Sequence, residues 1–229
     1  MDNPFPFSVV LFDLDGTIID SAPGVILALQ DTILELGRPA PSPQELRSWL
    51  GPPLPLSFTT HLGIKSTELA SALRIFAAKY SAAGAFQSHV YPGMREVLRG
   101  VWDAGIPSST ATSKIESHAK LVLDHFSLSP YLNFITGASE DETRSAKTLV
   151  VQDALTRLHE SGADISRPVL IGDRHHDVDG GLDNGVPTIM AAWGYGSPSE
   201  HAGSIDVAAR PEDLVGLLGI QAGPLAPAW

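Results

Sequence analysis

One stretch of sequence decides the fold of this chain, and it runs Val9-Val10-Leu11-Phe12-Asp13-Leu14-Asp15-Gly16-Thr17. A run of apolar, β-prone residues ends in two carboxylates one residue apart, and a glycine and a threonine follow directly. Because alternate side chains of a strand lie on opposite faces, Asp13 and Asp15 share one side only while the chain stays extended. Gly16 indicates that the chain turns here. The stretch therefore predicts two carboxylates at the carboxyl end of a buried strand, where open α/β sheets bind ligands.

A second acidic segment has the same pattern. The apolar residues 169–171 are followed by Gly172 and Asp173, and Asp177 comes four residues later, about one helical turn away if a helix begins here. Two strands of one sheet would then present carboxylates at the same edge, which supplies the oxygen ligands that Mg²⁺ prefers. Taken alone, Asp173 and Asp177 also fit turn and helix-cap residues, but the first motif favours the metal site.

Strand-like and helix-like patterns alternate over most of the chain. We expect strands over residues 9–12, 108–111, 133–136, 169–171, 188–192 and 207–208, and helices over 94–104, 116–125, 146–159, 178–184 and 211–218. Strands that alternate with helices predict βαβ units. The predicted fold class is therefore α/β, with a Rossmann-like parallel sheet.

A helical block interrupts this alternation just after the first strand. Apolar residues recur at helical spacing over 21–37, 44–50 and 66–80, and the block shows no strand-like alternation. Ser21 is the expected N-cap of the first helix, and Gly37 is its expected end. We therefore expect a small all-helical cap domain of residues 19–89, inserted into a catalytic core made of residues 1–18 and 90–229.

The composition disfavours several classes of protein. The 229 residues include 15 basic and 26 acidic side chains and no cysteine, which disfavours a nucleic-acid partner, a disulfide framework and thiolate chemistry. A small phosphorylated substrate needs only one local positive site and stays compatible. The N-terminus lacks a signal-peptide pattern, and no apolar run approaches the roughly 20 residues of a membrane span. We expect a cytoplasmic protein that contacts no membrane.

The order of the motifs resembles that of the haloacid dehalogenase-like superfamily. The matching features are Asp13-x-Asp15-Gly16-Thr17, the helical insert, a strand ending in Thr112-Ser113-Lys114, a later Lys147, and Gly172-Asp173-x-x-x-Asp177. The nearest branch is the phosphoglycolate-phosphatase-like hydrolases, which carry a helical cap after the first strand. The resemblance covers nearly the whole chain. It implies a Rossmann-like core, a cap over the active site and Mg²⁺-dependent phosphoryl transfer.

This resemblance assigns roles to four carboxylates. Asp13 matches the nucleophile, which attacks phosphorus and forms an aspartyl-phosphate. Asp15 matches the general acid, which protonates the leaving oxygen and then activates water, while its backbone carbonyl faces the metal. Asp173 matches the metal-ligating carboxylate, and Asp177 matches a ligand that acts at one remove or through water. The implied Mg²⁺ site therefore comprises Asp13, Asp15, Asp173 and Asp177.

The resemblance also implies a phosphate-binding set. Thr112 matches the hydroxyl that binds a phosphoryl oxygen, and Ser113 and Gly16 are further candidates for that contact. Lys147 matches the cation that neutralises phosphate charge and orients Asp13.

Neighbouring polar residues receive simpler interpretations. Arg144 competes with Lys147 for the cationic role, and we prefer Lys147 because the family's lysine lies at the start of such a helix. Lys114 could reach the site, but a solvated lysine is the preferred interpretation. A loop accounts for His175 and His176 better than metal ligation does.

Together these features predict a phosphatase that hydrolyses small phosphate monoesters with Mg²⁺. A phosphosugar mutase is the alternative enzyme, although Gly172 before Asp173 favours hydrolysis, and a catalytically silent binding protein is the alternative that is not an enzyme. Phosphoglycolate, a nucleoside monophosphate and a sugar phosphate are all compatible substrates. Candidate contacts that select the substrate lie near Arg47, Trp49 and the turn 51–54. Arg47 could bind a second anionic group such as a carboxylate, but a solvated helix position is the preferred interpretation. The sequence does not indicate an oligomeric state.

Overall fold

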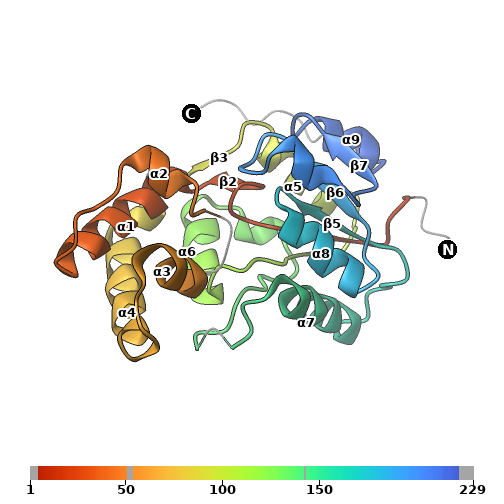
Figure 1. Cartoon of the computed structure of the whole chain (residues 1–229). Helices are drawn as coiled ribbons and strands as arrows, with labels where there is room; N and C mark the ends of the chain where they lie inside the picture. Colours follow the sequence, from red (N-terminus) through yellow and green to blue (C-terminus); the bar gives the residue numbers. More distant parts are fainter. Residues whose placement is uncertain (1–4, 51–53, 142, 222–229) are drawn as a thin grey trace. The chain divides into compact units, whose positions relative to one another are not determined.

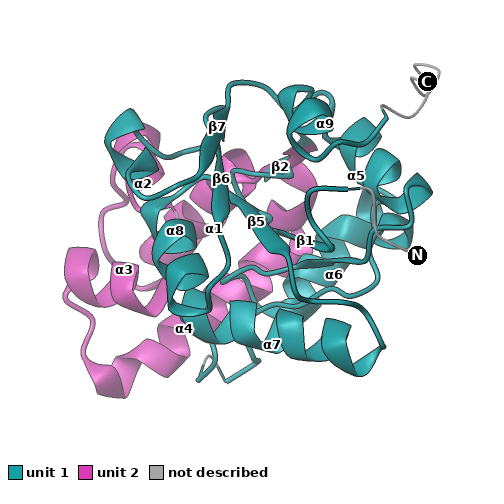
Figure 2. Cartoon of the chain, turned by 90° about the vertical axis from the view of Figure 1, so that its right-hand side faces the viewer, with its two compact units in different colours: residues 1–19, 90–229 teal, residues 20–89 magenta. Residues whose placement is uncertain are grey.

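The computed structural model describes residues 5–50, 54–141 and 143–221. Two compact units make up the chain (Figure 2), one comprising Met1–Ile19 and Val90–Trp229 and the other comprising Asp20–His89. Two short strands, β2 (Ile19–Asp20) and β3 (His89–Val90), pair in a two-stranded ribbon, and both unit boundaries fall within it.

A five-stranded parallel sheet forms the centre of the larger unit (Figure 1). Its strands are β1 (Val9–Phe12), β4 (Ser108–Thr110), β5 (Pro168–Gly172), β6 (Thr188–Ala191) and β7 (Asp206–Ala208), in the order β4-β1-β5-β6-β7. All four residues of β1 are buried, which is typical of a parallel strand covered on both faces. The predicted α/β class with a parallel sheet is confirmed.

Helices cover both faces of this sheet (Figure 2). They are α5 (Met94–Asp103), α6 (Glu116–His125), α7 (Lys147–Glu160), α8 (His175–Asp183) and α9 (Asp213–Leu217), with short 3₁₀ turns η2 (Ser129–Tyr131) and η3 (Pro198–His201). On one face α7 and α8 pack together and against β4, β5 and β6. The apolar side of α7, including Val150, Ala154 and Leu158, lies in one core cluster with Leu11 and Leu170.

The smaller unit is a set of helices with its own apolar centre. They are α1 (Ala22–Glu35), α2 (Pro43–Arg47), α3 (Leu54–Leu62), α4 (Ser66–Ala82) and the 3₁₀ turn η1 (Gly84–Gln87). The ring centroid of Phe76 lies 6.3 Å from that of Phe58 and 5.8 Å from that of Tyr80. Gly37, at φ +73°, follows the end of α1 as predicted. Ser21 is the N-cap residue of α1, also as predicted, although its side chain makes no capping hydrogen bond.

One helix was missed and two local predictions were wrong. The sequence did not reveal α3, because Pro55 looks like a helix breaker although a helix tolerates proline in its first turn. The expected strand 133–136 runs beside β4 but is not a strand, because the Thr136 amide donates to Thr110 Oγ1 rather than to a backbone carbonyl. His175 and His176 are the first two residues of α8 and not part of a loop.

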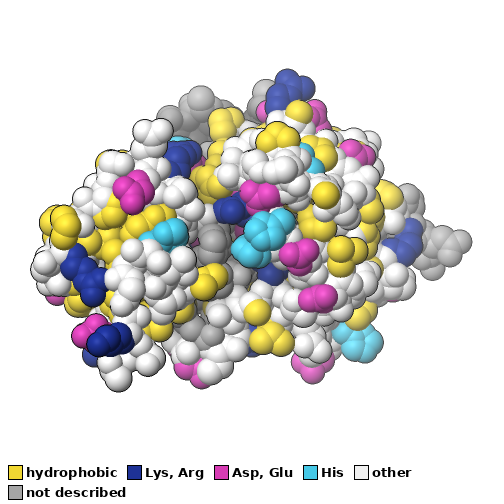
Figure 3. All heavy atoms as spheres, viewed as in Figure 1, with side chains coloured by type: hydrophobic (Ala, Val, Ile, Leu, Met, Phe, Trp, Pro, Cys, Tyr) yellow, Lys and Arg dark blue, Asp and Glu magenta, His cyan; other side chains and the backbone are white. Residues whose placement is uncertain are grey.

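Two features of the described chain bear on the predicted partners, namely the distribution of surface charge and the character of the helices. On the face drawn in Figure 3, basic side chains are scattered and interspersed with acidic ones. Among the described residues, no helix combines the length and the apolar character that a bilayer crossing requires.

Candidate active site

The register of the sheet brings the ends of three strands together. Phe12, the last residue of β1, lies level with Thr110 of β4 and with Ile171 of β5. The Asp13 amide still donates to the Ile171 carbonyl at 2.8 Å, so the chain stays paired with β5 for one more residue. As a result, the residues that follow β1, β4 and β5 meet at the carboxyl edge of the sheet, where α/β folds hold ligands.

Three buried carboxylates lie at this edge. One oxygen from each of Asp13, Asp173 and Asp177 lies within 4.8 Å of the others. Lys147 Nζ, at the start of α7, lies 2.8 Å from Asp13 Oδ1 and 2.7 Å from Asp177 Oδ1. It also donates to the Ala111 carbonyl at 2.9 Å. Among the residues that the structure describes, Lys147 is the cation paired with this cluster.

The titration behaviour of the cluster reflects an excess of negative charge. Burial raises the pKa of Asp13 to about 6, against the opposing effect of Lys147, and repulsion from Asp177 adds to the rise. Burial also raises the pKa of Asp173 well above its usual range, with further contributions from Asp177 and Asp13. Burial would lower the pKa of Lys147, but the charges of Asp13 and Asp177 outweigh it and raise that pKa. Three carboxylates with one lysine therefore fit a divalent cation, and all-oxygen ligands suit a hard ion.

Asp177 holds the turn that carries Asp173. Its Oδ2 accepts the amides of Asp173 at 3.1 Å and Arg174 at 3.0 Å, which caps the start of α8. The carboxylate packs so closely over Gly172 that a Cβ there would lie 2.2 Å from Asp177 Cγ. A glycine is therefore required before Asp173, and both oxygens of Asp177 are occupied by protein groups.

Asp173 is held against the turn that follows β1. Its Oδ2 accepts the Tyr195 amide at 2.7 Å, and its Oδ1 lies 3.5 Å from Thr17 Oγ1. Gly16 has φ +87°, and a Cβ there would lie 2.3 Å from Asp173 Oδ2. The motif glycine thus serves both the turn and the close approach of Asp173.

Asp15 has a partner that the sequence interpretation missed. Lys114 Nζ lies 2.8 Å from Asp15 Oδ1 and 2.7 Å from Oδ2, and the lysine side chain is only 8% exposed. The prediction that Lys114 is solvated was therefore wrong. The sequence contains a hint, because Lys114 follows the Thr112-Ser113 pair at the carboxyl end of β4.

The remaining predicted residues occupy distinct positions. Thr112 is buried after β4, and its Oγ1 accepts the Lys114 amide at 3.2 Å, while Ser113 next to it is half-buried. Arg144 pairs with Asp153 at 2.8 Å and with Glu116 at 3.6 Å. Lys147, not Arg144, therefore contacts Asp13.

Within the smaller unit, Arg47 and Trp49, the two candidates for substrate selection, differ in exposure. Arg47 is exposed on α2. Trp49 is buried, and its ring stacks on that of His61 with 4.5 Å between centroids. Residues 51–53 of the predicted turn lie outside the described residues.

Comparison with known proteins agrees with this geometry. The profile of the haloacid dehalogenase-like hydrolase family matches residues 10–191, so the chain belongs to that family. A solved structure of a predicted phosphatase from Clostridium acetobutylicum superposes with a TM-score of 0.85 at 30% identity, covering 92% of this chain and 97% of that one. The predicted fold and superfamily are thereby confirmed.

Two curated relatives indicate how the family has diversified. Tyrosine-protein kinase PtkA of Mycobacterium tuberculosis is 35% identical over 189 residues, which are 82% of this chain, and the match spans 63% of the length of that relative. Phosphoglycolate phosphatase of Aquifex aeolicus is 29% identical over 210 residues, covering 92% of this chain and 96% of that protein. The similarity to phosphoglycolate phosphatase supports the phosphoglycolate-phosphatase-like branch that the sequence pattern indicated.

Proposed function

We propose that this protein is a Mg²⁺-dependent phosphatase that hydrolyses small phosphate monoesters through a phosphorylated Asp13. The observation that carries the proposal is the buried Asp13 carboxylate, fixed by Lys147 beside Asp173 at the carboxyl edge of the sheet. Family membership and the similarity to phosphoglycolate phosphatase support the reaction class. The two compact units act as a catalytic core and a separate cap domain, with boundaries near residues 18 and 90.

In the first step, a carboxylate oxygen of Asp13 attacks the phosphorus atom, and the bond from phosphorus to the ester oxygen breaks. Asp15 gives its proton to the departing oxygen. The result is an aspartyl-phosphate on Asp13 and a free alcohol. Lys147 holds Asp13 in place through their 2.8 Å contact and offsets the negative charge of the incoming phosphate.

In the second step, water attacks the same phosphorus atom and Asp15 accepts its proton. The bond from phosphorus to Asp13 breaks, which releases inorganic phosphate and restores both carboxyl groups. Lys114 Nζ donates to both oxygens of Asp15 and thereby orients the carboxyl group that exchanges the proton. One residue thus acts first as an acid and then as a base.

The metal and the phosphate contacts complete the site. Asp13, Asp173 and the Asp15 carbonyl would hold Mg²⁺, which would lower the repulsion between the nucleophile and the phosphate. Asp177 acts at one remove, because its oxygens already bind Lys147 and the turn before α8. The Thr112 and Ser113 hydroxyls and the Gly16 amide are the proposed contacts of the phosphoryl oxygens.

The substrate is a small phosphorylated metabolite, and the test is phosphate release from a panel of monoesters with and without Mg²⁺. The panel contains phosphoglycolate, nucleoside monophosphates and sugar phosphates, with Asp13→Asn as the control variant. Mg²⁺-dependent release that the variant lacks supports the proposal. Conversion of a sugar phosphate to its isomer without net phosphate release would indicate the mutase. No reaction with any ester would favour a silent binding protein.

A second candidate function follows from the 35% identity to a protein named a tyrosine kinase. The same Asp13 centre would then receive or pass a phosphoryl group between ATP and a tyrosine hydroxyl. Incubation with labelled ATP and a tyrosine-containing peptide separates the two functions, since a kinase labels the peptide and a phosphatase releases free phosphate.

A further inference from the structure

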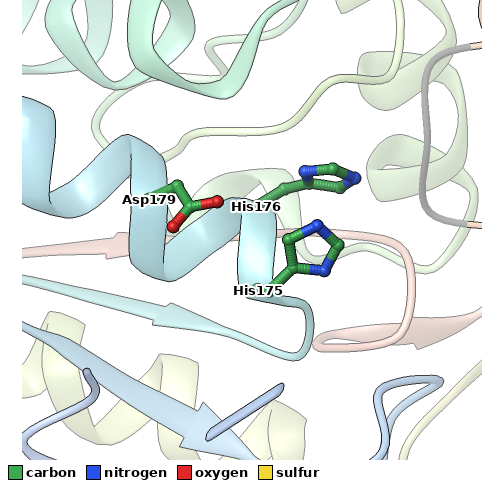
Figure 4. Close-up of side chains that lie close together, drawn as sticks. All are labelled: His175, His176 and Asp179. Carbon is green, nitrogen blue, oxygen red and sulfur yellow. The ribbon is translucent and has the colours of Figure 1, made fainter. Parts of the chain in front are cut away.

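The first two turns of α8 carry a group of side chains that the proposed reaction does not use. His175, His176 and Asp179 each offer one ligand atom, and these atoms lie within 4.8 Å of one another. Figure 4 shows the two imidazole rings next to each other at the start of the helix, with Asp179 on the following turn. The ring centroids are 3.8 Å apart. Figure 3 shows histidine side chains gathered at the surface over the start of α8.

The imidazole ring of His175 is oriented by a hydrogen bond to Glu200. His175 Nδ1 lies 2.9 Å from Glu200 Oε2, and a carboxylate can only accept, so Nδ1 carries the proton. In the neutral imidazole, Nε2 is then the nitrogen with a lone pair. Glu200 itself is held by Arg174 Nε at 2.8 Å and by the Ser197 amide at 3.1 Å. A carboxylate that orients a histidine in this way is a common feature of protein metal sites.

We propose that His175, His176 and Asp179 bind a first-row transition-metal ion of the Zn²⁺ type. Two imidazoles and one carboxylate suit such ions, whereas the carboxylate cluster of the active site suits Mg²⁺. Tetrahedral coordination at about 2.0–2.1 Å places ligand atoms about 3.3 Å apart. The ligand atoms lie within 4.8 Å of one another, and rotation about the χ angles of these side chains, none of which is buried, would bring them to that spacing. Three protein ligands leave one coordination position for water or a small anion.

This site is separate from the proposed catalytic function. Its ligands are two imidazoles and one carboxylate on α8, none of them buried, and the proposed Mg²⁺ ligands are buried carboxylates at the strand ends. Binding can therefore be measured without turnover. A failure of the catalytic proposal would leave this one intact, and the reverse also holds.

The test is Zn²⁺ titration of the full chain by calorimetry, in excess Mg²⁺ so that the carboxylate cluster is already occupied. The variants are His175→Ala, His176→Ala and Asp179→Asn, and the matched control is His159→Ala, which removes an exposed histidine at the end of α7. We expect one Zn²⁺ site in the wild type and in the control. Each ligand variant should weaken binding by at least about tenfold, as losses of metal-site partners do. Glu200→Gln should weaken it by a smaller factor.

Three results would overturn the inference: no Zn²⁺ binding by the wild type, equal affinity in all the variants, or a loss of binding in Asp173→Asn but not in the histidine variants. The absorption of bound Co²⁺ gives a second readout, because its visible bands depend on imidazole ligation. The histidine variants must then change the spectrum, and His159→Ala must leave it unchanged. Circular dichroism verifies that each variant is folded, and if one is not, the other two decide.

Discussion

Replacing Asp13 by asparagine should make the metal-free protein more stable near neutral pH. Asp13 is 8% exposed and belongs to a cluster of three carboxylates paired with Lys147. Its pKa rises from 3.8 to about 6, mainly through burial and despite Lys147. Each pKa unit corresponds to about 1.36 kcal/mol, so the ionised carboxylate costs roughly 3 kcal/mol of folding free energy. Asparagine keeps the shape without the charge.

The sign of the pH dependence follows from the same shift. Below pH 3.8 the group is protonated in both states and contributes nothing. Between 3.8 and about 6 the folded protein holds a proton that the unfolded chain has lost, so the contribution of Asp13 to stability falls as pH rises. Above about 6 the cost is complete. The difference between wild type and Asp13→Asn should therefore be small in acid and grow toward neutral pH.

The assay is thermal unfolding in EDTA and in Mg²⁺ over this pH range. In EDTA near neutral pH the variant should unfold about 6–12 °C above the wild type, since 1 kcal/mol shifts a midpoint by roughly 2–4 °C in chains of this size. Mg²⁺ should stabilise the wild type and have little effect on the variant. The matched control is Asp15→Asn, which should lower the midpoint because it removes the carboxylate charge that pairs with the buried Lys114. An Asp13→Asn variant less stable than the wild type in EDTA would refute the reasoning.

Three further changes test the site from other directions. Lys147→Met leaves the buried carboxylates without their cation and should cost about 3–5 kcal/mol in metal-free denaturant unfolding; an unchanged midpoint would contradict the pairing. Lys114→Met frees the Asp15 carboxylate and should lower kcat about 100-fold with little change in KM, whereas a purely structural role would leave kcat intact in the folded variant. Gly172→Ala places a Cβ 2.2 Å from Asp177 Cγ and should cost about 1–3 kcal/mol, measured by thermal unfolding.

Much of the sheet could be predicted because its signals are local. An apolar run that ends in an acid, as at Asp13 and Asp173, identifies both the strand and the edge where it stops. The helix α6 was predicted over 116–125, and the structure places it at Glu116–His125. Such patterns depend on neighbours within one or two turns of chain.

Most of the features that the sequence did not predict depend on contacts between residues far apart in the chain. Lys114 meets Asp15 across 99 residues of sequence, and nothing near Lys114 says that its charge is buried. The stretch 133–136 has strand-like composition, but the Thr110 hydroxyl takes the hydrogen bond that a strand would give to a backbone carbonyl. The early start of α8 is a local effect instead, because Asp177 accepts the amides of Asp173 and Arg174, four and three residues before it. The contacts of Lys114 and of Thr110 form only once the sheet has assembled.

The charge pattern of the site argues that it was selected for chemistry and not for stability. A cation that pairs with a buried carboxylate offsets part of its desolvation cost, yet here the pKa values of Asp13 and Asp173 stay raised although Lys147 lies beside the cluster. Strained or destabilising arrangements of this kind persist where function requires them. The surrounding chain also accommodates this arrangement, because position 172 must be a glycine for Asp177 to pack over it. A fold optimised for stability alone would replace at least one of these acids, and the sequence keeps all three.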